Sequence, residues 1–143
     1  MREISFFIAV CFCFSCMNTN SQIIENIEAL TFKTKISEID GLIIDVRTPE
    51  EFSSGYIADA TNIDFYANDF DHKLNIISKN QPIYIYCRSG GRSSAAAKKL
   101  EKLGFNEVYN LSGGISSWNS AGYKINKLSD RSSKSIKKWN RNI

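Results

Sequence analysis

Short apolar runs and stretches of helical spacing alternate along the chain from Ile23 onward. Short apolar runs bounded by turn residues are typical of buried strands, and apolar residues three or four positions apart are typical of helices that pack on a sheet. Strands that alternate with helices form parallel sheets, because each parallel connection must cross over the sheet. The pattern therefore predicts an α/β domain with a mainly parallel sheet.

Four runs predict strands. Residues 83–86 (IYIY) alternate β-branched and aromatic residues directly after Pro82, which is the composition that strands prefer. Residues 42–46 (LIIDV) form a short, β-branched run, and residues 61–63 and 108–111 are briefer versions of the same pattern.

Five segments predict helices. Phe32, Ile36 and Ile39 recur at helical intervals. Residues 93–103 (SSAAAKKLEKL) are strong helix formers with an alanine face, and Gly104 ends them.

The other three helices are short. Residues 49–54 follow Thr48, a good N-cap residue, and stop at Gly55. Residues 70–77 place apolar side chains on one face, and residues 113–120 surround a tryptophan.

The chain of 143 residues has room for one domain. We assign residues 23–124 to it, because helical and strand patterns fade after Tyr123. Residues 125–143 form a basic tail of net charge +5, so the rest of the chain, at −2 out of the total of +3, is not basic. Because a short basic run at a chain end is usually a solvated extension, we expect no nucleic-acid partner.

The N-terminus has the pattern of a signal peptide. Arg2 is followed by the apolar residues 4–14 (ISFFIAVCFCF) and then by the polar residues 18–22. The apolar stretch is too short to span a bilayer, which takes about 20 residues. We therefore expect residues 1–20 to direct export, which places the domain in the periplasm.

The residues from Cys13 to Cys16 resemble the processing site of bacterial lipoproteins, where a small residue precedes a cysteine that is lipidated. Ser15 and Cys16 fit that pattern, whereas Cys13 replaces an aliphatic residue and Phe14 is bulky. We expect lipidation at Cys16 and hence a membrane-anchored lipoprotein. Ordinary cleavage near Ser21 and an uncleaved anchor remain alternatives.

Cys87 is the only cysteine outside this N-terminal stretch, so neither an internal disulfide nor a zinc site is expected in the domain. It opens the loop CRSGGRS at the end of a predicted strand, where open α/β sheets place their ligand sites. Gly90 and Gly91 let the loop curl so that backbone N–H groups point inward. The helix expected from Ser93 adds unpaired N–H groups and the positive end of its dipole, which together suit an anion.

A thiol in this loop is expected to ionise readily. The helix terminus contributes about 0.3 to 2 kcal/mol, which lowers a thiol pKa from about 8.5 to about 7 at most, and Arg88 and Arg92 add to the effect. Cys87 is therefore predicted to be a nucleophile without a histidine base, since His72, the single histidine, lies in another segment. An inert buried cysteine would not explain the glycines and arginines that follow it.

Three segments resemble the rhodanese family, in the family's order. Residues 45–63 (DVRTPEEFSSGYIADATNI) are similar to a signature in which Asp-x-Arg precedes Glu-Phe, Gly-His-Ile and Ala-x-Asn-Ile. Residues 83–105 resemble the active-site strand, loop and helix, and residues 110–123 resemble the closing Gly-Gly-x-x-x-Trp segment. The resemblance covers residues 30–123.

This resemblance implies a rhodanese-like three-layer fold with a five-stranded, mainly parallel sheet flanked by helices. It implies a thiosulfate or persulfide sulfurtransferase in which Cys87 accepts a sulfane sulfur as a persulfide and passes it to a thiol or to cyanide. The loop residues that would bind the persulfide or the substrate are Arg88, Ser89, Gly90, Gly91, Arg92 and Ser93. Asp45, Arg47 and Glu51 match positions that organise the fold near the site.

The implied partners are a small sulfur donor and a thiol or protein acceptor, with no cofactor or metal, and we expect a monomer. Two positions depart from the family pattern: Tyr56 stands where histidine is usual and Asp59 where glycine is usual. Neither belongs to the loop, so we expect them to affect local packing more than activity.

Two other functions use similar features. Cysteine phosphatases and arsenate reductases also hold a thiolate at a helix N-terminus, but with five residues between cysteine and arginine. Here Arg92 follows Cys87 after four residues, and Ser93 occupies the phosphatase spacing. A non-catalytic binding module is the second alternative, although such rhodanese-like domains have lost the cysteine.

Overall fold

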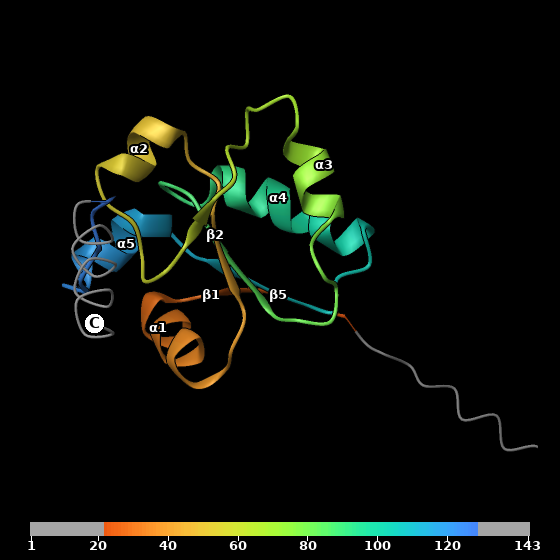
Figure 1. Ribbon diagram of the computed structural model, residues 1–143. Helices are drawn as coiled ribbons and strands as arrows, with labels where there is room; N and C mark the ends of the chain where they lie inside the picture. Colours follow the sequence, from red (N-terminus) through yellow and green to blue (C-terminus); the bar gives the residue numbers. More distant parts are fainter. Residues whose placement is uncertain (1–21, 129–143) are drawn as a thin grey trace, which may run out of the picture.

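The computed structural model describes residues 22–128. Five parallel strands form one sheet in the order β1-β5-β4-β2-β3 (Figure 1). The strands are β1 (Ile23–Ile27), β2 (Leu42–Asp45), β3 (Thr61–Asn62), β4 (Ile83–Tyr86) and β5 (Glu107–Leu111). The helices are α1 (Ala29–Glu38), α2 (Pro49–Ser53), α3 (Phe70–Asn75), α4 (Gly91–Lys102) and α5 (Gly114–Ser120).

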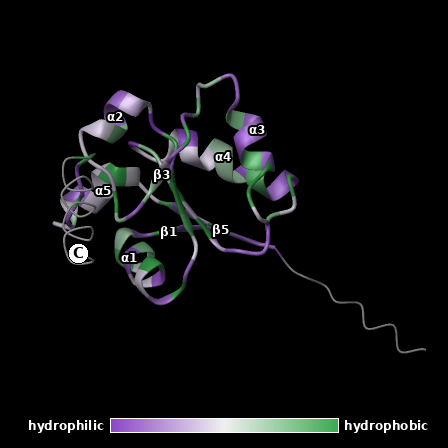
Figure 2. Cartoon of the chain, in the orientation of Figure 1, coloured by the Kyte–Doolittle hydropathy of each residue, from purple (hydrophilic) through white to green (hydrophobic). Residues whose placement is uncertain are grey.

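Helices cover both faces of the sheet, which gives three layers: α3 and α4 lie on one side, and α1 and α5 on the other (Figure 1). The central strand β4 is buried along its whole length. Because side chains alternate along a strand, Ile83 and Ile85 pack in the cluster that contains Leu100 of α4, while Tyr84 and Tyr86 face the other layer. Figure 2 shows the hydrophobic residues concentrated where the strands and helices meet.

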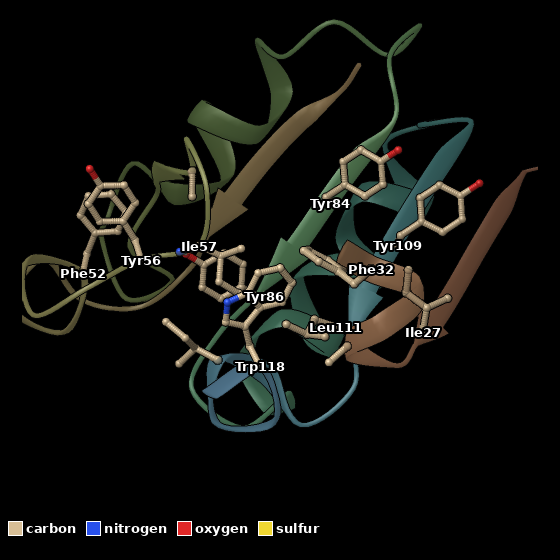
Figure 3. Packing of buried hydrophobic residues seen from close by; sticks show 13 residues of the cluster. Ile27, Phe32, Phe52, Tyr56, Ile57, Tyr84, Tyr86, Tyr109, Leu111 and Trp118 are labelled. Carbon is tan, nitrogen blue, oxygen red and sulfur yellow. The ribbon is translucent and has the colours of Figure 1, made fainter. Parts of the chain in front are cut away.

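The layer formed by α1 and α5 packs on the sheet through an aromatic cluster (Figure 3). The ring of Phe32 on α1 makes edge contacts with the rings of Tyr84, Tyr86 and Trp118, at centroid distances of 5.8, 6.5 and 6.2 Å. Edge-to-face contacts between aromatic rings add to the stabilisation from burial. The cluster thus fixes β4, whose last residue precedes Cys87, against α1 and α5.

The structure confirms the α/β class, the five-stranded parallel sheet, and the four strands and five helices expected from the pattern, with shifts at several ends. One shift affects the loop: α4 begins at Gly91 rather than near Ser93. Gly90 precedes it with φ 101°, a left-handed conformation that turns the chain directly into the helix. The residues from Gly91 to Ser93 therefore form the first turn.

The periodicity did not predict β1. This strand lies at the edge of the sheet and pairs only with β5. Most of its residues are exposed or partly exposed, so its sequence IIENI lacks the continuous apolar run of a buried strand. No helix within residues 22–128 is long and apolar enough to cross a membrane.

Residues 125–127, which the sequence pattern placed in the basic tail, contact the domain. The backbones of Tyr56 and Asn126 exchange two hydrogen bonds, of 2.9 and 2.8 Å. The side-chain amide of Asn126 donates to the carbonyl of Ala58 at 2.7 Å, and Ile125 packs against the core. Tyr56 is buried and stacks on Phe52 with ring centroids 4.5 Å apart. Residues 129–143, the rest of the tail, lie outside the described residues, as do the expected signal sequence and Cys16.

Candidate functional site

Cys87 directly follows β4 and precedes the turn that leads into α4. Since β4 lies between β5 and β2, the thiol sits at the carboxyl end of the central part of a parallel sheet, the usual place for a ligand site in this class of fold. Cys87 is 1% exposed. Of the residues that the structure describes, it is the one free cysteine.

Hydrogen-bond donors from the start of α4 surround the sulfur of Cys87. The backbone N–H of Gly90 donates to Sγ at 3.1 Å, and the hydroxyl of Ser93 lies 3.4 Å from it. Burial raises the pKa of Cys87, but hydrogen bonds from the Ser93 side chain and from the backbone N–H groups of Ser93, Gly90 and Ser89 outweigh that effect and bring the pKa below its ordinary value. The loop therefore favours the thiolate, as the sequence predicted.

The N-terminus of α5 holds the backbone of this loop in place. The N–H groups of Ile115 and Ser116 donate to the carbonyls of Cys87 and Arg88, at 2.9 and 3.1 Å. Gly114 makes this close approach possible, because a Cβ atom there would overlap the carbonyl oxygens of both loop residues. Its φ of 59° also favours glycine. Sequence reasoning did not count Gly114 as a site residue, although the Gly-Gly-x-x-x-Trp segment contained the signal.

Asp45 forms a buried ion pair with Arg47, and it lies opposite Tyr86, the residue before Cys87, in the sheet. Nη2 of Arg47 lies 2.6 Å from Oδ2 of Asp45, and the same nitrogen donates to the carbonyl of Gly55. Burial opposes the charge on Arg47, but the hydrogen bond and the charge of Asp45 raise its pKa above the ordinary value. The amide of Asn62 donates to the carbonyls of Asp45 and Arg47. These bonds join β2, β3 and the end of α2 and leave both charged groups away from solvent.

Glu51 of α2 and Arg92 of α4 form an ion pair, which we call the mouth of the loop, although 41 positions separate them in the chain. The two terminal nitrogens of Arg92 donate to the two carboxylate oxygens of Glu51, at 2.7 and 2.8 Å. The hydrogen bond from Arg92 lowers the pKa of Glu51 to about 2. The ring of Tyr66 lies 5.6 Å from the guanidinium carbon of Arg92. The sequence linked neither Glu51 nor Tyr66 to Arg92.

The predicted loop residues differ in their exposure to solvent. Arg88, Ser89 and Gly91 are exposed, and Gly90 is partly exposed. The structure thus brings Gly90 and Ser93 onto the sulfur, pairs Arg92 with Glu51, and leaves Arg88 facing solvent.

The candidate site is defined by the thiol and its hydrogen-bond donors. A cavity of about 220 Å³ lies between α3 and α4, lined by Asp71, Lys99, Lys102 and Leu103, and it contains none of the loop residues. Within residues 22–128, no cluster of three or more His, Cys, Asp or Glu side chains is arranged to hold a metal ion.

Comparisons with known proteins point to one family. The sequence model described as "Rhodanese-like domain" matches residues 28–121, which is more than half of the chain. A protein of Bacillus subtilis named "Uncharacterized protein YqhL" is 42% identical over 76 residues, which are 53% of this chain and 59% of that protein. A protein of Allochromatium vinosum named "Sulfurtransferase" is 38% identical over 86 residues, 60% of this chain and 78% of that protein.

A solved structure has the same arrangement of strands and helices. The rhodanese-related protein of Thermoplasma volcanium superposes with a TM-score of 0.64 and 31% sequence identity. The match covers 71% of this chain and 97% of that one. The architecture described above is therefore one that an experimentally determined protein shares.

Proposed function

The chain belongs to the family of rhodanese-like domains, and we propose that it is a sulfurtransferase that moves a sulfane sulfur through a persulfide on Cys87. The donor in this proposal is thiosulfate or a related small molecule, and the acceptor is a thiol or cyanide. The name of the Allochromatium vinosum relative supports the general activity. The observation that carries the proposal is the buried thiol with hydrogen-bond donors that favour its ionised form.

In the first half-reaction the Cys87 thiolate attacks the outer sulfur of thiosulfate. Its electron pair forms the new S–S bond, while the old S–S bond breaks and its pair leaves with sulfite. Cys87 then carries the persulfide anion. The Gly90 N–H and the Ser93 hydroxyl contact Sγ, which becomes the inner sulfur of this intermediate, and so stabilise part of its negative charge.

In the second half-reaction an acceptor thiolate or cyanide attacks the outer sulfur of the persulfide. The bond between the two sulfurs breaks, and its electron pair returns to Cys87 as the thiolate. Because Cys87 is 1% exposed, the acceptor has to approach as a small molecule or a slender segment. Splitting the transfer into these two steps gives ping-pong kinetics.

The geometry favours this reaction over phosphate chemistry. In the phosphatase reading the loop arginine holds the phosphate oxygens, but the two terminal nitrogens of Arg92 already bind the carboxylate of Glu51. Ser93, at the phosphatase spacing, is buried against Sγ. A purely structural module would not need a thiol whose pKa is lowered in this way.

Peptide-level mass spectrometry of the full chain after exposure to thiosulfate tests the proposal. We expect the Cys87 peptide to gain the mass of one sulfur atom and to lose it on addition of cyanide or a thiol. The Cys87→Ser variant is the control and should neither gain sulfur nor turn over. An active Cys87→Ser variant, or double-reciprocal plots that intersect, would refute the persulfide mechanism.

We also propose that the chain is exported and lipidated at Cys16, on the sequence of residues 1–22 alone. Acyl chains on Cys16 would hold the domain at a membrane surface. Fractionation of the producing cells, with mass analysis of the N-terminal peptide, tests this. Recovery of soluble cytoplasmic protein that starts at Met1 and carries an unmodified Cys16 would contradict it.

A further inference from the structure

We propose that Glu51 determines donor specificity: by holding Arg92 in an ion pair, it makes the mouth of the loop favour sulfur donors of low negative charge over the dianion thiosulfate. The inference rests on the proposed sulfurtransferase function and adds a role for a residue outside the loop. Glu51 comes from α2, whereas the loop joins β4 to α4. Its role is positioning and electrostatic, without a bond to the reacting sulfur.

The ion pair occupies the part of Arg92 that would bind a donor. Nη1 and Nη2 of Arg92 each bind one carboxylate oxygen of Glu51, the paired geometry in which a guanidinium also binds sulfonate-like oxygens. The Tyr66 ring lies within cation–π distance of the same group. A donor anion would have to displace Glu51 in order to use Arg92 in this way.

Glu51 is itself held so that it does not move aside easily. It is the third residue of α2 and completes a capping box with Thr48: the Thr48 N–H donates to the Glu51 carboxylate at 3.1 Å, and the Glu51 N–H donates to the Thr48 hydroxyl at 3.4 Å. With a pKa of about 2, the carboxylate keeps its charge throughout the range in which the thiol can react.

The ion pair lies beside the surroundings of Cys87, because Arg92 directly precedes Ser93, whose hydroxyl lies 3.4 Å from Sγ. The hydrogen bond and charge of Glu51 are the main causes that raise the pKa of Arg92, and the charge on Cys87 contributes as well. Arg88, in contrast, is exposed and has no ion pair within residues 22–128. With Arg92 neutralised, Arg88 is left as the loop cation available to an anionic donor.

The test compares two donors that differ by one negative charge. Thiosulfate is a dianion, and methanethiosulfonate is a monoanion that releases a sulfinate in the same step. Glu51→Gln removes the charge while glutamine can still fill the third position of the capping box and accept from Arg92. Coulomb's law for one unit charge acting over a few ångströms of largely aqueous medium predicts that the ratio of kcat/KM for thiosulfate to that for methanethiosulfonate rises about three- to ten-fold.

Two control variants separate charge from structure. Glu50→Gln removes the same charge at the neighbouring, exposed position of α2, and we expect the donor ratio to stay within about two-fold of the wild type, because exposed charges are screened. Glu51→Asp keeps the charge, so its donor ratio should stay near that of the wild type even if the helix is less stable. An unchanged ratio in Glu51→Gln, or an equal shift in Glu50→Gln, overturns the proposal.

A second measurement does not require sulfur transfer. Alkylation of Cys87 by the anion iodoacetate and by the neutral iodoacetamide, followed on the Cys87 peptide, reports the charge at the mouth directly. The rate ratio of iodoacetate to iodoacetamide should rise in Glu51→Gln by a similar factor of about three to ten. If this ratio does not change, Glu51 has no such role. If it rises while neither donor loads sulfur on Cys87, the proposed function fails instead.

Discussion

The Ser93 hydroxyl gives the sharpest test of how the loop ionises Cys87. Its oxygen lies 3.4 Å from Sγ and 3.2 Å from the carbonyl oxygen of Gly90, and a hydroxyl has only one proton to donate. While Cys87 is a thiol, the proton can go to the carbonyl. When Cys87 ionises, the charged sulfur becomes the better acceptor, because hydrogen bonds to charged groups are stronger.

Replacing Ser93 with alanine removes the hydroxyl that donates to the ionised sulfur. A bond to a charged acceptor is about 1 kcal/mol stronger than one to a neutral acceptor, so the thiolate loses about 1 kcal/mol, which is roughly a five-fold effect on its equilibrium with the thiol. The loss raises the pKa of Cys87. At pH values below that pKa, the Ser93→Ala variant should therefore react about five-fold more slowly than the wild type.

The assay is the rate of Cys87 alkylation by iodoacetamide across a pH series. The midpoint should move to higher pH in Ser93→Ala, and the two proteins should react at similar rates at pH values above both midpoints, where each is fully ionised. Ser94→Ala is the matched control, since Ser94 follows Ser93 and its side chain makes no hydrogen bond to the sulfur among the described residues. A midpoint that stays in place, or a rate deficit that persists at high pH, would refute this reasoning.

Three other perturbations test the surrounding structure. Gly114→Ala should lower the free energy of unfolding by about 2 to 4 kcal/mol in urea titrations, because its Cβ would overlap two loop carbonyls and its φ is left-handed. The control Gly122→Ala has a left-handed φ but open space around it, so it should lower the free energy of unfolding by only about 1 to 2 kcal/mol. Equal losses in the two variants would contradict the packing explanation. Because the pKa of Glu51 is about 2 in the folded protein and about 4.3 in an unfolded chain, its ion pair should stabilise the fold above pH ~4.3 and lose that contribution as the pH falls toward ~2. Because 29% of the Glu51 side chain is accessible to solvent, the ion pair is screened and its acid-sensitive contribution to the free energy of unfolding is about 1 kcal/mol. Unfolding titrations at different pH values should show this contribution in the wild type and in Glu50→Gln but not in Glu51→Gln. Identical pH profiles in all three proteins would count against the ion pair's role. Finally, no second cysteine lies within residues 22–128 to form a disulfide with Cys87. Peroxide should therefore oxidise the free thiolate to an irreversible sulfinic acid, whereas protein that carries a persulfide should regain activity after reduction by a thiol. An equal and permanent loss of activity in both forms would disprove this protection.

The sequence by itself predicted four of the five strands, the five helices and the loop that Cys87 opens. Strand β4 could be predicted from its run of β-branched and aromatic residues, and helix α4 from its alanine-rich sequence. Both patterns are local, because strand and helix periodicity depend on residues only a few positions apart. The glycines that follow Cys87 and the helix expected after them sufficed to predict a thiolate favoured by backbone N–H groups, and the Gly90 N–H lies 3.1 Å from the sulfur. The hydrogen bond from the Ser93 hydroxyl to the sulfur was not predicted.

The tertiary structure decided what depends on distant parts of the chain. Strand β1 has few local signals because it lies at the edge of the sheet, where most of its residues are at least partly exposed, and its partner β5 lies more than 80 positions away in the chain. Glu51 has the local signature of a capping box, but its pairing with Arg92 follows from where the ends of β2 and β4 meet in the sheet. Gly114 could be identified as a glycine of the closing segment, yet its contact with the Cys87 carbonyl exists only once α5 packs on the loop. Sequence periodicity specifies which face of an element is apolar, whereas the packing of elements against one another specifies which polar groups come within hydrogen-bond distance.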